Sequence, residues 1–156
     1  MNDWQQDRIG SAERGENPTV LMKLLSGYAV MGDTQFLPGY CVLLATPSVI
    51  HLNDLPIAER QRFLLDMSLL GGAIESACQP NGVLRVNYEI LGNTDTFLHA
   101  HVFPRYTWEP TERRLHPVWL YPNTMWTDNE YLYAEKHQTL KETIQRELLR
   151  LVQQTA

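Results

Sequence analysis

The sequence has few cysteines, no surplus of positive charge and no long hydrophobic run. Cys41 and Cys78 are the two cysteines among 156 residues, and they form no Cys-x-x-Cys pair. Such usage argues against a disulfide framework or a structural zinc site, and it is typical of the reducing cytoplasm. The net charge of -5 offers no cationic footprint for a nucleic acid polymer, whereas a small phosphorylated ligand needs only a locally positive pocket.

Patterns typical of export or membrane insertion are missing as well. The first residues contain no cationic segment followed by an apolar one, so we expect no secretory signal. The longest apolar runs, such as 41–45, have about five residues, whereas a membrane-spanning helix needs about 20. We therefore expect a single domain over residues 1–156, with a cytoplasmic location and no membrane partner.

Apolar periodicity predicts an α+β domain. From Asp54 to Gln79 the apolar residues recur at steps of three and four, which predicts one long helix after a first pair of strands. Strands on both sides of this helix favour a mostly antiparallel five-stranded sheet. Short apolar segments bounded by turn residues predict these strands at 28–31, 40–46, 83–88 and 97–104, and residues 20–25 fit either a strand or a short helix.

The C-terminal third, residues 107–152, differs in character from the rest. The segment 107–126 holds three of the four tryptophans, so we expect a packed loop there rather than a disordered one. Thr127 and Glu130 fit a helix capping box, which predicts a C-terminal helix from Thr127 to about Val152.

One predicted strand carries the candidate chemistry. Between Phe97 and Arg105, a single alanine separates His99 from His101, so both imidazoles point to the same face of a strand. Pro104 has no N–H for the sheet ladder, which predicts that the strand ends there. Arg105 then lies at the end of the strand, where a cation can contact an anion.

Two neighbouring imidazoles are open to three interpretations. They can lie on a partly exposed sheet face without a chemical role. They can ligate zinc, although the scattered His51, His116 and His137 suggest no third and fourth ligand. Alternatively, one neutral imidazole can attack phosphorus and form a phosphohistidine-type intermediate. This needs one ring nitrogen to donate to an acceptor while the other keeps its lone pair.

Several motifs together resemble the histidine-triad (HIT) superfamily of nucleotidyl hydrolases and transferases. The stretch from Phe97 to Arg105 resembles its signature, in which three histidines alternate with apolar residues, often before Pro-Arg. Residues 37–44 resemble its Pro-(Gly/Thr)-His turn and following strand. Val86-Asn87 and Gly92-Asn93-Thr94 resemble its Asn, then Gly-Gln-Ser/Thr, pattern before the triad.

The resemblance covers roughly residues 26–106 and implies a role for each matched residue. The middle histidine of the family is the nucleophile, and His99 matches it. The third histidine contacts the phosphates and supports the site, and His101 matches it. Phosphate contacts are implied in the same way for Asn87, Gly92, Asn93 and Thr94.

Further matches and two departures complete the comparison with the family. Asp33 is the candidate for binding the ribose hydroxyls, with Gly32 in its place if the alignment shifts by one residue. Arg105 is a candidate for contacting a polyphosphate tail, and a solvated basic edge is the alternative. Phe97 stands where the first histidine of the triad is expected, and Tyr40 stands where a histidine usually follows Pro-Gly.

The resemblance implies an enzyme that needs no cofactor and no metal for its covalent step. Its substrate is a nucleoside phosphate derivative, such as diadenosine tetraphosphate, another dinucleoside polyphosphate, or a phosphoramidate. Family members commonly form homodimers through a helix and a sheet edge, so a homodimer is expected. The alternative is a nucleotide-binding or sensor protein with a HIT-like fold and no turnover.

Overall fold

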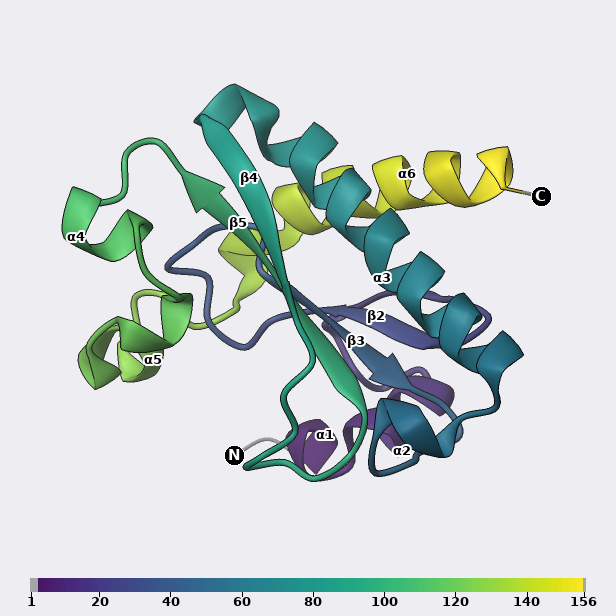
Figure 1. The fold of residues 1–156 in the computed structure, drawn as a ribbon. Helices are drawn as coiled ribbons and strands as arrows, with labels where there is room; N and C mark the ends of the chain where they lie inside the picture. Colours follow the sequence, from purple (N-terminus) through teal and green to yellow (C-terminus); the bar gives the residue numbers. More distant parts are fainter. Residues whose placement is uncertain (1–2, 156) are drawn as a thin grey trace.

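The computed structural model describes residues 3–155, and one antiparallel sheet of five strands forms its centre (Figure 1). The strand order is β1-β2-β3-β5-β4, and each neighbouring pair is antiparallel. This confirms the predicted sheet and the predicted α+β class, and it makes residues 20–23 a strand. The strands are β1 (Val20–Lys23), β2 (Gly27–Met31), β3 (Cys41–Ala45), β4 (Val83–Glu89) and β5 (His99–Tyr106).

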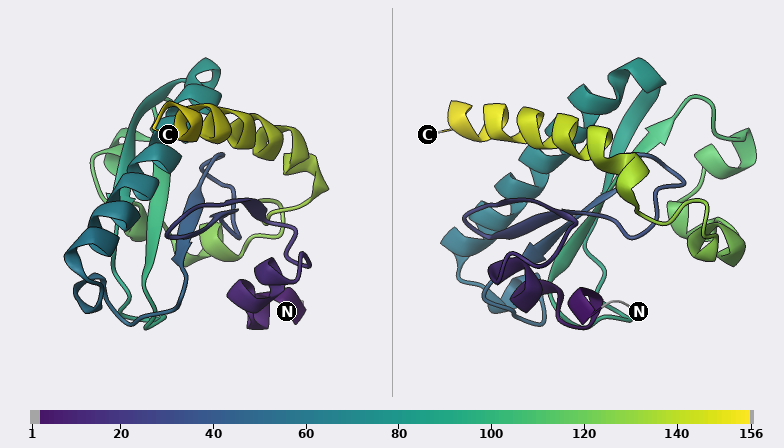
Figure 2. Two further views of the ribbon diagram at one scale, coloured as in Figure 1. Left: turned by 90° about the vertical axis from the view of Figure 1, so that its right-hand side faces the viewer. Right: turned by 180° about the vertical axis from the view of Figure 1, so that it is seen from behind.

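Two long helices cover one face of the sheet (Figures 1 and 2). α3 (Ile57–Cys78) follows the β2–β3 hairpin, and α6 (Gln138–Gln154) packs against it. Phe63, Leu70 and Ile74 of α3 are completely buried, because their spacing places them on one side of the helix, toward the sheet. Within residues 3–155, no helix combines the length and the hydropathy that crossing a bilayer requires.

A pair of glycines allows α3 to pack closely on both of its neighbours. A Cβ atom on Gly71 would lie 2.1 Å from the hydroxyl oxygen of Tyr88 on β4. A Cβ atom on Gly72 would lie 3.1 Å from a methyl group of Leu151 on α6. The cost of glycine inside a helix, about 1 kcal/mol each relative to alanine, is therefore offset by close packing on the sheet and on α6.

Short helices from other parts of the chain lie away from α3 and α6 (Figure 2). α1 (Asp3–Gln6) and α2 (Arg8–Glu13) come from the N-terminus. α4 (Thr111–Arg114) and α5 (Asn123–Thr127) belong to the tryptophan-rich segment, which therefore contains helical turns instead of a plain loop. Turns of 3-10 helix occur at Leu52–Asp54, Gln79–Asn81, Val118–Leu120 and Glu135–His137.

The predicted end of the histidine strand at Pro104 is wrong, because β5 continues to Tyr106. β3 pairs with β5 only as far as Val102, whereas β4 stays paired with it up to Tyr106. Beyond Val102, β5 therefore has one neighbour instead of two. A strand tolerates proline in such an edge position, where one row of backbone groups needs no partner.

The predicted start of the C-terminal helix at Thr127 is also wrong, because α6 begins at Gln138. The backbone around Leu132 pairs with the chain after β2 instead. The amide of Gln35 donates to the carbonyl of Tyr131 at 2.6 Å, and the amide of Tyr133 donates to the carbonyl of Asp33 at 2.8 Å. Backbone groups used in this ladder cannot serve a helix, so long-range pairing overrides the local capping signal.

Candidate functional site

A cleft of about 930 Å³ opens on the sheet face that α3 does not cover. Its floor consists of residues of β2, β3 and β5. On β3 and β5 the lining residues alternate, as Val42 with Leu44 and His99 with His101, because successive strand residues point to opposite faces. Its walls come from α1, α2 and the tryptophan-rich segment. Parts of the chain on both sides of residues 26–106 therefore complete this cleft, which we call the histidine cleft.

His99 lies at the start of β5 in this cleft, with 7% of its surface exposed. Its Nδ1 is 2.7 Å from the backbone carbonyl oxygen of Phe97. Because a carbonyl oxygen only accepts, Nδ1 must carry a proton, and Nε2 of the neutral ring keeps its lone pair. The Phe97 ring packs on the imidazole, with ring centroids 4.7 Å apart. His99 therefore meets the tautomer condition for a nucleophile.

His101 lies next to His99 on the same face, with ring centroids 4.8 Å apart. Its Nδ1 is 2.7 Å from the hydroxyl oxygen of Tyr40, which directly precedes the neighbouring strand β3. Burial, and then the adjacent His99, lower the pKa of His101 to about 4, so this ring is neutral at pH 7. Burial also raises the pKa of Tyr40 far above its usual value. The hydrogen bond therefore joins two neutral groups.

Two tryptophans form an aromatic wall beside His101. The Trp119 indole stacks parallel on that of Trp126, with centroids 4.9 Å apart and an angle of 6° between the rings. Its edge contacts His101 at a centroid distance of 4.8 Å. The Trp119 Nε1–H donates to the carboxylate of Glu89, which lies opposite His101 on β4. The tryptophan-rich segment thus reaches the candidate site.

Asp33, the predicted ribose ligand, lines the histidine cleft and is paired with Arg8 of α2. The two terminal nitrogens of Arg8 donate to the two carboxylate oxygens at 2.8 and 2.5 Å. Both side chains are partly exposed, so a ligand in the cleft can reach either of them. Arg8 thereby brings a cation to the cleft that a phosphorylated ligand would need.

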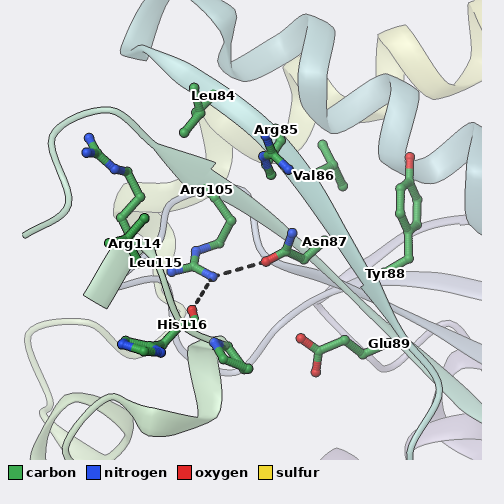
Figure 3. Close-up of a pocket in the computed structure, with 11 residues that line it drawn as sticks. Leu84, Arg85, Val86, Asn87, Tyr88, Glu89, Arg105, Arg114, Leu115 and His116 are labelled. Atoms are coloured by element: carbon green, nitrogen blue, oxygen red, sulfur yellow. Dashed lines mark hydrogen bonds between the residues drawn. The ribbon is translucent and has the colours of Figure 1, made fainter. Parts of the chain in front are cut away.

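Asn87 and Arg105 meet in a second pocket of about 600 Å³, between β4 and residues 114–117 (Figure 3). Arg105 is only 3% exposed. Its guanidinium donates to the Glu109 carboxylate at 3.0 Å, to Oδ1 of Asn87 at 3.0 Å and to two backbone carbonyls at 2.8 Å. Neither Asn87 nor Arg105 lines the histidine cleft.

The loop before β5 holds the three remaining predicted phosphate ligands. Gly92 has a φ of 80°, a left-handed conformation that glycine adopts without a steric penalty. Asn93 and Thr94 are exposed and do not line the histidine cleft, whereas Asp95 of the same loop does. The phosphate-binding role of this loop stays a prediction.

Reasoning from the sequence missed several contributors to the cleft, among them Arg8, Trp119 and Trp126. The clustering of tryptophans was a signal that their segment packs, but nothing in it indicated His101 as the neighbour. Arg8 gave no signal because it precedes the motifs that carry the resemblance. Tyr40 was recognised only as a departure from the family pattern.

The donor set for a metal ion is incomplete around the two histidines. His51, His116 and His137 do not line the histidine cleft. Within residues 3–155, no three histidine, cysteine or acidic side chains converge as possible metal ligands. The Nδ1 atoms of His99 and His101 instead bind a carbonyl and a hydroxyl group, which fix proton positions.

Comparisons with known proteins identify the fold. A scan against protein-family models finds no match, and a search of curated proteins finds none either. Among solved structures, a histidine triad (HIT) protein from Sinorhizobium meliloti 1021 is similar, with a TM-score of 0.70 at 18% sequence identity over 94% of this chain and 96% of that chain.

Two further solved structures agree with the first. A histidine triad protein from Marinobacter aquaeolei VT8 gives a TM-score of 0.61 at 22% identity, over 88% of this chain and 90% of that chain. A hypothetical histidine triad nucleotide-binding protein from Sulfolobus tokodaii strain7 gives 0.64 at 14% identity, over 92% and 91%. The chain therefore has the fold of the histidine triad proteins, as its motifs implied.

Proposed function

We propose that the protein is a nucleotidyl hydrolase or transferase that forms a nucleotidyl-histidine intermediate on His99. One observation carries the proposal: the hydrogen bond from Nδ1 of His99 to the Phe97 carbonyl leaves a lone pair on Nε2 in the histidine cleft. A neutral imidazole held in this tautomer needs no further base to attack phosphorus. Since Phe97 contributes its backbone carbonyl, the absence of a histidine side chain at this position leaves the nucleophile's tautomer intact.

The proposed reaction has two steps. In the first, Nε2 of His99 bonds to the α-phosphorus, the bond to the leaving group breaks, and the leaving group keeps the electron pair and takes a proton from water. In the second, a water molecule attacks the same phosphorus, the phosphorus–nitrogen bond breaks, and the attacking water gives one proton to the hydroxide that the first step left. The nucleoside monophosphate departs, and neutral His99 is restored. An N–H of His101 donates to a phosphoryl oxygen and stabilises its growing charge.

The composition of the cleft supports a nucleoside phosphate derivative as substrate. Arg8 supplies positive charge, and Trp119 and Trp126 supply a flat apolar wall that suits an aromatic group. We assign the ribose hydroxyls to Asp33, and the phosphates to Gly92, Asn93 and Thr94 of the loop whose Asp95 lines the cleft. We assign to Asn87 and Arg105 an indirect part, in which they hold β4 against β5 beside the site.

Turnover of two compounds tests this proposal. Diadenosine tetraphosphate and adenosine phosphoramidate offer a phosphate and an amine leaving group at the same α-phosphorus, and we expect at least one to be hydrolysed to AMP. His99→Ala should abolish turnover, while His51→Ala should not change it, because His51 is exposed and does not line the cleft. Equal turnover by His99→Ala, or none by the wild type, would contradict the proposal.

A second candidate function is nucleotide binding without turnover. It is favoured by Phe97 and Tyr40, which stand where the family usually has histidines. Calorimetry distinguishes the two functions: AMP binding that survives in His99→Ala, with no hydrolysis by the wild type, would identify a nucleotide-binding or sensor protein.

We further propose that the protein forms a homodimer across β4 and α3. β4 lies at the edge of the sheet, with Leu84 and Tyr88 49% and 43% exposed. An open edge with apolar side chains presents unpaired backbone groups to which a strand of another chain can pair. Light scattering after size exclusion should give twice the chain mass of 18.0 kDa, and Leu84→Asp should reduce it to one chain. A monomeric wild type would contradict the dimer.

We also propose a cytoplasmic location. Cys41 and Cys78 are both free thiols in buried positions, which is the usual state of cysteines in a reducing compartment. Fractionation of cells that produce the full-length chain tests this directly, and recovery with the secreted fraction would contradict it.

A further inference from the structure

Tyr40 is fixed on the floor of the histidine cleft by contacts with β5 and with the residue that follows β2. Its ring stacks on Phe103 of β5, with centroids 3.9 Å apart and an angle of 10° between the rings. It also covers Gly32, next to β2, where a Cβ atom would lie only 2.2 Å from a carbon of the Tyr40 ring. Phe103 and the bare backbone of Gly32 therefore define where the Tyr40 hydroxyl lies, and this position is 2.7 Å from Nδ1 of His101.

The direction of this hydrogen bond follows from the partners on each side. Within residues 3–155, the Tyr40 hydroxyl forms one hydrogen bond, which joins it to Nδ1 of His101. The hydroxyl is buried, and a buried donor left without an acceptor is costly. The hydroxyl therefore donates to Nδ1, which must be unprotonated, and His101 carries its proton on Nε2.

We propose that Tyr40 is a positioning residue that fixes His101 as the Nε2–H tautomer, opposite to the tautomer of His99. The two adjacent rings then present different atoms on the same side: Nε2 of His99 offers a lone pair, and Nε2 of His101 offers a proton. The first suits attack on phosphorus and the second suits donation to a phosphoryl oxygen. The catalytic consequence rests on the proposed function, whereas the tautomer itself does not.

The tautomer decides whether His101 can act as a donor at all. Burial lowers the pKa of His101 to about 4, so the ring does not become a donor at both nitrogens near pH 7. In the other neutral tautomer, Nε2 would turn a lone pair toward the phosphoryl oxygen and repel it. The Tyr40 hydroxyl thus determines whether Nε2 of His101 attracts or repels the phosphoryl oxygen.

Nitrogen NMR of the histidine rings tests the proposal without a substrate. In uniformly 15N-labelled wild type at pH 7, His101 should show one protonated nitrogen, Nε2, and one unprotonated nitrogen, Nδ1. In Tyr40→Phe both tautomers become populated, so the two 15N shifts of His101 should move toward each other while those of His99 stay in place. Gly32→Ala should act similarly, because it displaces the Tyr40 ring without removing the hydroxyl.

Tyr28→Phe is the matched control, since it removes a hydroxyl from the neighbouring strand β2 without contacting a histidine; it should leave both rings unchanged. A wild-type His101 protonated on Nδ1, or a Tyr40→Phe variant with unchanged His101 shifts, would overturn the proposal. With a substrate that the wild type hydrolyses, Tyr40→Phe should lower kcat about threefold to tenfold, the typical effect of one hydrogen bond, with a smaller change in KM. Absence of wild-type turnover would remove the proposed function but not the NMR result.

Discussion

The two pockets beside β5 differ in whether their polar groups are already hydrogen-bonded within the protein or are free to bind a ligand. In the pocket of Figure 3, the guanidinium of Arg105 is saturated by Glu109, Asn87 and backbone carbonyls. In the histidine cleft, the hydrogen bonds of His99 and His101 engage only Nδ1. For each ring, no group within residues 3–155 forms a hydrogen bond with Nε2.

This difference separates a structural role from a chemical one. A buried charge whose donors are all paired stabilises the fold and has no capacity for a ligand. Imidazoles with one fixed nitrogen and one unpaired nitrogen are oriented for chemistry. Arg105 therefore has a structural role, whereas the two histidines remain candidates for the chemistry.

Glu109→Gln should cause the largest loss of stability. It removes the charge partner of Arg105, and both side chains of this pair are almost completely buried. Loss of one partner in a buried ion pair costs about 3–5 kcal/mol of unfolding free energy, which urea denaturation measures. A loss below about 1 kcal/mol would contradict the structural role of Arg105, because surface ion pairs have effects of that size.

The pH dependence of stability should report on His101. Its pKa of about 4 in the folded protein lies below the ordinary value of 6.5, so the unfolded chain takes up a proton first as the pH falls. The associated stability is complete above about pH 6.5 and decreases by up to about 3 kcal/mol toward pH 4. Urea denaturation of wild type and His101→Gln at pH 7 and 4.5 isolates this contribution. Equal losses in both proteins would contradict it.

Trp119→Ala should open the histidine cleft and expose His101 to solvent. The indole helps to bury His101, and burial is the main cause of its low pKa. The pKa of His101 should therefore rise from about 4 toward 6.5, which NMR titration of the ring protons measures. Trp108→Ala is a suitable control, since Trp108 packs on Tyr106 outside the cleft. An unchanged pKa in Trp119→Ala would show that other groups bury His101.

Asp33→Asn should have the smallest effect on stability. The Arg8–Asp33 pair is partly exposed, and pairs of this kind contribute less than about 1 kcal/mol. Thermal unfolding should shift only slightly, whereas KM for a nucleotide substrate should rise if Asp33 accepts from the ribose. A loss of stability as large as that of Glu109→Gln would show that the Arg8–Asp33 pair has a structural role instead.

Most of the sheet and the long helix followed from local patterns. The spacing of Phe63, Leu70 and Ile74 predicts α3 because one buried helix face requires such intervals. The strand end predicted at Pro104 and the helix start predicted at Thr127 were wrong, because pairing with distant parts of the chain overrode these local signals. β4 keeps β5 paired beyond Val102, and residues 33–35 pair with 131–133.

The site was predictable where a short motif carried it. His99 and His101 share one face because strand residues two apart must do so. Arg8 and Trp119 reach their positions through contacts with residues far along the chain, which local spacing does not encode. The hydrogen bond between Tyr40 and His101 likewise depends on the β3–β5 register, which pairs Val42 with His101.

The covalent intermediate is the most direct test of the central claim. Wild-type protein mixed with adenosine phosphoramidate or diadenosine tetraphosphate is quenched in base, where a phosphorus–nitrogen bond to histidine survives, and analysed by peptide mass spectrometry. The account predicts an added AMP on the peptide that contains His99, and none in His99→Ala. Hydrolysis without such an adduct, or an adduct on another residue, would contradict it.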